Sequence, residues 1–242
     1  MSSLEIRVHT HQLTPRDRIC LTWVAMQYAV RLDQLQRLLF RYTPEGDRYK
    51  LKVERDHLSL DRTYEIIKKW LVMELIEKKT ILHGDQLWIW ASRQGLRETQ
   101  QPFNFSGAPS SIRLPHLYAI NQVRMAIEIK RPEDVWKSER QIRKETPVAV
   151  KGEKQSHTPD AILSATNGKV TAIEVECHEK TDSELEDDLR ELAVSYRSIW
   201  YFTTRATRRQ IETMLDTFEP EMKKPFVLYD LKEYTGHEYG IS

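Results

Sequence analysis

The chain has 242 residues, 40% of them hydrophobic, which is enough material for one large or two small globular domains. Its 37 Lys and Arg residues are matched by 36 Asp and Glu residues, so the formal net charge is only +1. This balance excludes a protein that binds nucleic acid through overall positive charge, and any such affinity must come from local basic patches.

The cysteine content and the hydropathy of the sequence indicate the cellular compartment in which the protein is expected. Cys20 and Cys177 are far apart, and neither has a CxxC partner, so neither a disulfide framework nor a zinc ribbon is expected. The first ten residues lack an apolar core of signal-peptide length, and no apolar run approaches the roughly 18 residues of a membrane span. We expect a cytoplasmic protein without a membrane partner.

The first helix is predicted to begin after Thr14, because threonine is a good N-cap and the proline that follows suits the first helical position. Apolar residues then recur at helical spacing as far as Val30. A second helix is predicted over residues 32–39, where leucines form the apolar stripe.

A third helix and a hairpin complete the first domain. The helix is expected to start at Ser59 or Asp61 and to run to about Lys79, with Tyr64 on its inner face, and two apolar strands then surround a turn at residues 83–85. Three helices followed by a hairpin is the order of a winged helix-turn-helix domain, here residues 1–100. In that fold the third helix enters the major groove of DNA and the hairpin touches the backbone.

The residues predicted to contact double-stranded DNA are Arg62, Lys68, Lys69 and His83. An ordinary solvated helix face is the alternative interpretation of the three basic residues of the helix.

Residues 101–114 are rich in Pro, Gly, Ser and Asn and are predicted to link two domains. The second domain, residues 115–242, alternates helical and strand-like patterns. This alternation predicts an α/β core with a mixed sheet, so that the whole chain is α+β. Its expected elements are a helix over 115–130, a mixed segment over 135–143, two paired strands between 160 and 180, a helix over 183–195, a strand over 198–204, a helix over 207–218 and a strand over 225–229.

The paired strands carry the most informative pattern of the chain. Side chains alternate along a strand, so Glu174, Glu176, His178 and Lys180 are expected to share one face, opposite to the apolar residues between them. A buried carboxylate is costly unless something cationic neutralises it, and a hard divalent cation with oxygen ligands is one solution. The alternative is an edge strand whose solvated acids pair with Lys or Arg.

Asp160 belongs to the same prediction. It follows Pro159 at the start of the first strand, and a turn over residues 166–169 allows it to meet Glu174 on the neighbouring strand. Two like charges at close range raise one pKa unless a cation binds between them. Mg²⁺ or Mn²⁺ in such a place activates water and stabilises the charge that develops on a phosphate.

The second half resembles the PD-(D/E)XK nuclease superfamily. Pro159-Asp160 matches the PD, and Glu174-Val175-Glu176 occupies the position of (D/E)XK. The resemblance implies that Asp160, Glu174 and Glu176 bind Mg²⁺ or Mn²⁺. Glu176 departs from the pattern, because the superfamily usually has a lysine there. Lys180 is expected to supply that ammonium if the strand continues or the chain turns back, and a solvated lysine is the alternative.

Two further residues enter through this resemblance. Glu139 is similar to the acidic residue that the first helix of such cores often contributes, and a surface ion pair with Arg143 or Lys137 is the alternative. His157, just before the PD strand, is expected to contact a phosphate or a metal-bound water, and a structural histidine is the alternative. His116 and the acidic run from Glu184 to Asp188 are interpreted as structural, the run as an N-terminal helix face that suits the helix dipole.

The whole chain is similar to a narrower family, the replication-relaxation proteins of plasmids and integrative elements, which combine an N-terminal winged helix with this nuclease-like core. The matching stretches are the start of the first helix at 14–17, residues 34–40, His116 with 121–124, residues 136–140, and the two strands of the candidate site. The resemblance implies action on DNA in replication, relaxation or transfer of a mobile element. Other proteins of that element and a second copy of the chain are possible partners.

The predicted function is that of a metal-dependent DNA endonuclease or nickase. One alternative is a DNA-binding or assembly protein with an inactive nuclease-like core, for which the missing lysine after Glu174 is the main support. The other is a winged-helix transcriptional regulator that uses the core to dimerise.

Overall fold

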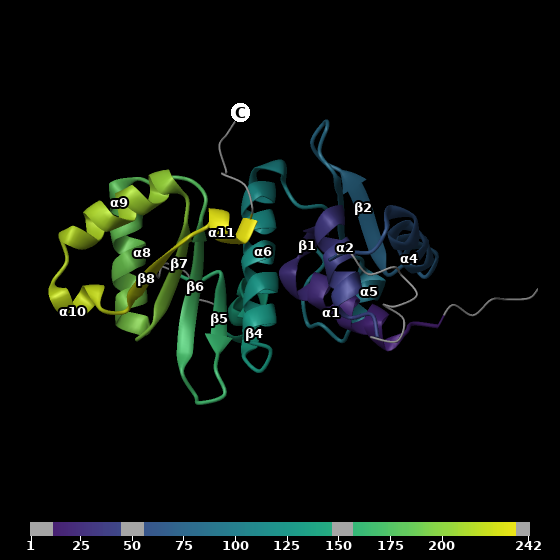
Figure 1. The fold of residues 1–242 in the computed structure, drawn as a ribbon, viewed down its shortest axis with the longest axis horizontal. Coiled ribbons are helices and arrows are strands. Elements are labelled where there is room, and N and C mark those ends of the chain that lie inside the picture. The colour runs from purple at the N-terminus through teal and green to yellow at the C-terminus, as the bar shows by residue number, and fades with distance from the viewer. Residues whose placement is uncertain (1–11, 45–55, 147–156, 236–242) are drawn as a thin grey trace, which may run out of the picture. The chain divides into compact units, whose positions relative to one another are not determined.

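The computed structural model describes residues 12–44, 56–146 and 157–235. The fold is α+β, and the chain divides into two compact units. The first unit contains residues 1–25 and 31–108, and the second contains residues 26–30 and 109–242. The strands of these described stretches form two sheets, one of three strands and one of five (Figure 1).

The three-stranded sheet has the order β1-β3-β2, and β2 and β3 are an antiparallel hairpin in which Thr80 pairs with Leu87. The elements of this part of the chain, in order, are α1 (Pro15–Gln27), β1 (Ala29–Arg31), α2 (Leu32–Arg41), α4 (Leu60–Val72), β2 (Ile76–Thr80), β3 (Leu87–Ala91) and α5 (Arg93–Glu98).

The start of α1 follows the prediction from its sequence. The Asp17 backbone N–H donates to Thr14 Oγ1 at 3.2 Å, and the Thr14 N–H donates to an Asp17 carboxylate oxygen at 3.0 Å. The expected continuation to Val30 is wrong, because the helix ends at Gln27 and Tyr28 has a φ of 79°. A left-handed residue cannot propagate an α-helix, so the chain turns into β1.

The third helix is shorter than predicted and is rotated. It ends at Val72 instead of about Lys79, because Glu74 adopts a φ of 57° and the Leu75 N–H bonds back to the Trp70 carbonyl at 2.9 Å. Ile76–Thr80 is therefore a strand, not a helical turn. Tyr64, expected inside, is 43% exposed, whereas the residues that are buried are Thr63, Ile66, Ile67 and Trp70.

The segment predicted as a linker is partly packed. Phe103 and Phe105 lie against a small apolar cluster formed by Ala25, Ala91 and Leu96. Residues up to 108 are accordingly grouped with the first unit, and residues from 109 with the second.

The second unit is built on a mixed sheet, as predicted. Its order is β4-β5-β6-β7-β8; β4, β5 and β6 are antiparallel neighbours, and β7 and β8 add in parallel. The expected mixed segment 135–143 resolves into strand β4 and helix α7. The elements are η2 (Ser111–Arg113), α6 (Leu114–Lys130), β4 (Val135–Ser138), α7 (Glu139–Glu145), β5 (Ala161–Ser164), β6 (Val170–Glu176), α8 (Asp182–Ser195), β7 (Ile199–Thr203), α9 (Arg205–Asp216), α10 (Pro220–Lys223), β8 (Phe226–Asp230) and α11 (Lys232–Thr235).

Helices cover both faces of this sheet, with α6 on one side and α8 and α9 on the other (Figure 1). On the α6 side, Ile173 and Val175 of β6 and the following Cys177 join one apolar cluster. On the other side, Ala172 joins the cluster under α8 and α9. The alternation predicted for residues 172–177 is therefore correct, and it places Glu174 on the face that α8 and α9 cover.

Residues 26–30 are grouped with the second unit, where buried polar side chains hold them. Asn121 of α6 donates to the Ala29 carbonyl at 2.9 Å, and the Gln27 amide donates to Asn121 at 3.2 Å. The Trp136 indole N–H donates to Gln27 at 3.3 Å. Asn121 is fully buried, so these bonds satisfy groups that would otherwise be costly.

Within the described stretches, none of the helices is both long enough and apolar enough to cross a membrane.

A buried ion pair ties α1 to α4. The Asp17 side chain is fully buried, and the Lys69 ammonium lies 2.5 Å from its carboxylate. Burial acts to raise the pKa of Asp17, but hydrogen bonds from Lys69 and Thr14 outweigh it and hold that pKa below its usual value. Lys69, predicted to contact DNA, has a structural partner.

Replacing Lys69 with methionine is expected to lower the free energy of unfolding by about 3 kcal/mol, because it leaves a buried carboxylate unpaired. Lys68→Met removes an exposed lysine one position away and is expected to cost less than about 0.5 kcal/mol. Denaturant unfolding measures both changes. Equal losses in the two variants would contradict a structural role for Lys69, and Asp17→Asn combined with Lys69→Met should recover part of the loss.

Candidate functional site

The predicted site residues of the second half meet in one cavity. It has a volume of about 450 Å³ and lies entirely within the second unit. Its lining holds six carboxylates against one arginine, one lysine and two histidines, so acidic groups are in excess even when both histidines are protonated. The lining residues are His116, Glu139, Arg143, His157, Thr158, Asp160, Glu174, Val175, Glu176, Lys180, Asp188 and Glu191.

Asp160 directly precedes β5 and uses both carboxylate oxygens. Oδ2 accepts the Val175 backbone N–H at 2.8 Å, and Oδ1 lies 3.0 Å from His116 Nε2. Burial acts to raise the pKa of Asp160, but the His116 imidazolium and the Val175 N–H outweigh it and lower that pKa. His116 was interpreted as structural; the structure places it in the cavity, as the charge partner of a predicted metal ligand.

Glu174 is the most deeply buried acid of the site. It is 4% exposed, and its Oε1 lies 2.8 Å from His157 Nε2. Burial, followed by the nearby Asp160 charge, raises the pKa of Glu174 to about 7, although His157 opposes the shift. The interpretation of these acids as residues of a solvated edge strand is wrong, because β6 is the central strand of the sheet.

Glu176 is the last residue of β6, so Lys180 does not share the strand face as expected, and of the two routes considered for it the structure shows the chain that turns back. The chain turns after Cys177, His178 is exposed, and the Lys180 ammonium reaches back to Glu176 Oε2 at 2.6 Å. Burial acts to lower the pKa of Lys180, but Glu176 and Asp188 outweigh it and raise that pKa. An ammonium therefore stands at the carboxylate that occupies the expected lysine position, although it comes from outside the strand.

Asp188 was missed by the sequence interpretation. Its Oδ1 lies 3.0 Å from His157 Nδ1, and its Oδ2 lies 3.0 Å from Lys180 Nζ. Burial acts to lower the pKa of His157, but hydrogen bonds to Asp188 and Glu174 raise it to about 10. A signal was present in the sequence, because Asp188 lies three residues after Leu185 and one before Leu189, both of which are buried on the inner face of α8.

Glu139 lines the cavity and is also paired at the surface. Its carboxylate lies 2.7 Å from Arg143 and 3.5 Å from Arg113. Lys137, the other partner considered for it, binds Glu145 instead. The Glu139 backbone N–H donates to the Asp160 carbonyl at 2.9 Å, which fixes the start of α7 beside the site.

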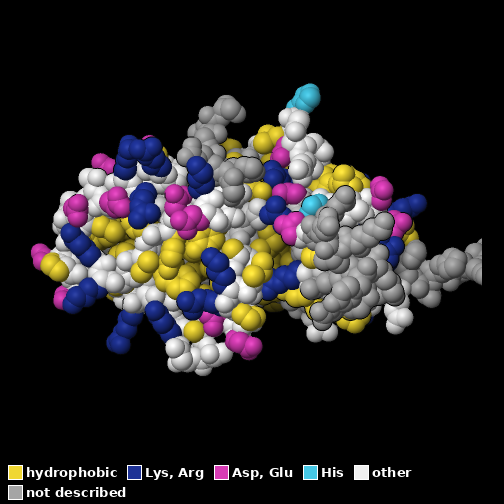
Figure 2. Space-filling model, viewed as in Figure 1, with side chains coloured by type: hydrophobic (Ala, Val, Ile, Leu, Met, Phe, Trp, Pro, Cys, Tyr) yellow, Lys and Arg dark blue, Asp and Glu magenta, His cyan; other side chains and the backbone are white. Residues whose placement is uncertain are grey.

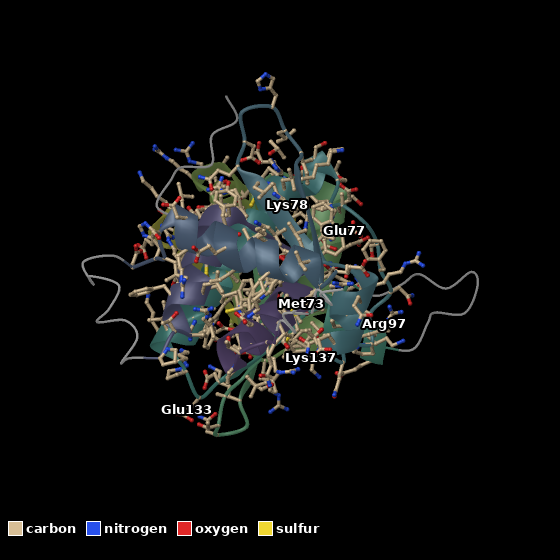
Figure 3. The ribbon with its side chains drawn as sticks, turned by 90° about the vertical axis from the view of Figure 1, so that its right-hand side faces the viewer. Met73, Glu77, Lys78, Arg97, Glu133 and Lys137 are labelled. Carbon is tan, nitrogen blue, oxygen red and sulfur yellow. The ribbon has the colours of Figure 1, made fainter. Side chains whose placement is uncertain are left out.

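The residues predicted to contact DNA all lie in the first unit. Arg62 is exposed and pairs with Glu65 at 2.8 Å, Lys68 is exposed, and His83 is exposed in the turn of the hairpin. Lys69 is paired with Asp17. On β2 the exposed Lys78 and its neighbour Glu77 project from the hairpin (Figure 3). Among the described residues on the face drawn in Figure 2, Lys and Arg side chains are interspersed with acidic ones.

The donors suit a hard divalent cation, because carboxylate oxygens are the ligands that Mg²⁺ and Mn²⁺ prefer. Among the described residues, no hydrogen bond or ion pair engages Glu174 Oε2 or Glu176 Oε1, so both atoms are available as ligands. Within the part of the chain that the structure describes, no group of three or more His, Cys, Asp or Glu side chains is arranged to coordinate a metal ion. Each Asp160 oxygen already accepts one hydrogen bond, so a metal at Asp160 would use the remaining lone pair of one of these oxygens.

Comparison with protein-family models, with curated proteins and with solved structures finds no match to this chain.

The buried carboxyl of Glu174 predicts a pH dependence of stability. The pKa of this carboxyl is raised from 4.5 to about 7 in the folded protein. Below pH 4.5 the carboxyl is protonated in both the folded and the unfolded state and does not lower stability, but it destabilises the fold as the pH rises from 4.5 to about 7. Relative to Glu174→Gln, the wild type should lose on the order of 2 kcal/mol of unfolding free energy between about pH 4.5 and about pH 6.5. His157 is protonated throughout this window. Denaturant unfolding in a chelator measures the difference, and parallel pH curves for the two proteins would contradict it.

Proposed function

We propose that the chain is a metal-dependent DNA endonuclease or nickase whose second unit hydrolyses a phosphodiester bond. One observation carries the proposal: Asp160, Glu174 and Glu176, from the start of β5 and from β6, open into the same cavity with the Lys180 ammonium 2.6 Å from Glu176. Paired carboxylates with an adjacent ammonium are the groups that metal-assisted hydrolysis requires.

The order of elements supports a PD-(D/E)XK core. The described elements from α6 to β7 are a helix, a strand, the short helix α7, two further strands antiparallel to the first, a helix and a parallel strand, with the PD at the start of β5 and Glu174 near the end of β6. The order helix, strand, helix, helix and hairpin in the first part of the chain supports a winged helix in the same way. Both orders fit the resemblance to replication-relaxation proteins, which implies action on the DNA of a mobile element.

The excess of acids explains why a metal is part of the proposal. A phosphodiester is repelled by a cavity in which carboxylates outnumber basic groups, unless cations neutralise them. Asp160, Glu174 and Glu176 would hold Mg²⁺ or Mn²⁺, which supplies an activated water and charge stabilisation.

The roles of the other groups follow from their charges. Water adds to phosphorus, one P–O ester bond breaks, and the leaving oxygen takes a proton. Lys180 is cationic and can stabilise the negative charge that develops on the phosphate. His157, with its pKa raised to about 10, is protonated at neutral pH and acts as a charge partner of Glu174, not as a base.

A second candidate is a DNA-binding or assembly protein whose core is inactive. The observation that favours it is the neutralisation within the chain: Asp160 pairs with His116, Glu174 with His157, and Glu176 with Lys180. Such a network satisfies the acids without any metal. It predicts DNA binding that chelator does not affect and that Asp160→Ala leaves unchanged.

Plasmid nicking separates the two candidates. With Mg²⁺ or Mn²⁺, the wild type is expected to relax supercoiled plasmid, and Asp160→Ala is expected to lower the rate at least about 100-fold because it removes a metal ligand. Asp216→Asn on α9 is the matched control, since Asp216 is 86% exposed and does not line the cavity. Calorimetric titration of Mn²⁺ should show binding to wild type that Asp160→Ala loses. Intact plasmid with the wild type, or equal cutting by both proteins, would remove the nuclease proposal.

DNA binding by the first unit is tested separately. Arg62→Ala and Lys68→Ala are each expected to weaken binding and to reduce the slope of log K against log salt by about 0.9, because each removes one phosphate contact. Lys224→Ala, at an exposed site of the second unit, is the control. Salt slopes from fluorescence anisotropy measure the effect, and unchanged slopes in both variants would place the DNA contact elsewhere.

A further inference from the structure

The two basic groups at the acids of β6 share one partner. His157 Nε2 lies 2.8 Å from Glu174 and Lys180 Nζ lies 2.6 Å from Glu176, while the other side of each cation faces Asp188. The distances from Asp188 are 3.0 Å to His157 Nδ1 and 3.0 Å to Lys180 Nζ. Acid and base thus alternate along an open chain of five side chains, which runs from Glu174 through His157, Asp188 and Lys180 to Glu176.

We propose that Asp188 is a positioning residue that holds Lys180 and His157 against the carboxylates of β6, and that it compensates for the lysine this strand lacks. The inference rests on the proposed function for its catalytic meaning, but the contacts themselves are independent of it.

The reason a positioning residue is needed is that Lys180 lies outside the strand. A lysine in a strand would be aimed by the sheet, whereas Lys180 follows the turn after Cys177 and has a long side chain with much rotamer freedom. Its direction must be fixed by other contacts.

The backbone of Lys180 is fixed by α9. Gln210 accepts the Lys180 N–H at 3.2 Å and donates to the Lys180 carbonyl at 2.6 Å. This pair of bonds places the Cα but leaves the side chain free. Asp188 supplies the remaining constraint, since its second oxygen is the other contact of the ammonium.

Asp188 is itself held by a well-formed helix. Thr181 and Glu184 make a reciprocal capping box at the start of α8, in which Thr181 Oγ1 accepts the Glu184 N–H at 3.3 Å. Leu185 and Leu189 on either side of Asp188 are buried in the core. The carboxylate therefore projects from a rigid element, which is what orientation of a reacting group requires.

Three variants test the proposal. Asp188→Asn keeps the shape and removes the charge, Asp188→Glu keeps the charge and moves it by one methylene, and Glu186→Gln on the same helix is the control, since its ion pair with Arg190 lies at the surface. The measurements are kcat and KM for plasmid nicking with Mg²⁺, and the ¹⁵N NMR signal of the Lys180 ammonium, assigned with Lys180→Arg.

Asp188→Asn is expected to lower kcat about 10- to 100-fold with KM changed less than about twofold, as loss of an orienting partner does. The Lys180 ammonium should gain rotational freedom. Glu186→Gln should match the wild type, and Asp188→Glu should restore part of the kcat that the asparagine variant loses.

The result that overturns the proposal is a wild-type kcat and an unchanged Lys180 signal in Asp188→Asn, or in Asp188→Glu if the asparagine variant does not fold. If the wild type itself cuts no DNA, the nuclease proposal fails, but the NMR signal still tests the positioning role of Asp188. A gain in rotational freedom of the Lys180 ammonium in Asp188→Asn supports that role, and an unchanged signal refutes it.

Discussion

The constraint on which the rest of the site depends is the burial of the Glu174 carboxylate on the central strand of the sheet. A carboxylate removed from water must be neutralised or protonated. The position of Glu174 in β6 fixes the direction of its side chain. Because the neighbouring apolar residues of the strand pack on the α6 side, Glu174 faces α8 and α9. His157 lies at one of its oxygens, and Asp188 lies at the other ring nitrogen of His157. The ion-pair network thus extends from the buried Glu174 carboxylate through His157 to Asp188.

Local structure makes this network possible without large distortion. The strand ends at Glu176, the chain turns, and the capping box at Thr181 starts α8 immediately after Lys180. A lysine placed there is close to two elements at once, so its ammonium can meet Glu176 of β6 and Asp188 of α8. The turn therefore places a positive charge beside Glu176 from outside the strand.

Much of this architecture could be predicted from the sequence, because alternation and helical spacing are local signals. The side chains of residues 172–177 alternate between the two faces of the sheet as expected. Helix α1 starts at the position that Thr14 and Asp17 indicate. The failures have physical causes. Glu74 and Tyr28 adopt left-handed conformations that no composition rule requires, and these end two helices early. Lys69 looked solvated because the buried charge it neutralises is 52 residues away in the chain. Asp188 and His116 join the site only through tertiary packing.

The same network bears on the choice between a nuclease and an inert core. An ion-paired cluster is a poor source of stability when buried, since desolvation offsets much of the attraction. A core selected only for stability would more readily carry apolar residues at these positions. Here two cations touch the acids of β6 and a third touches Asp160, while one oxygen of Glu174 and one of Glu176 stay unengaged within the described residues. Ion-paired carboxylates that keep an unengaged oxygen can still bind a ligand. This arrangement favours a functional site over a purely structural network.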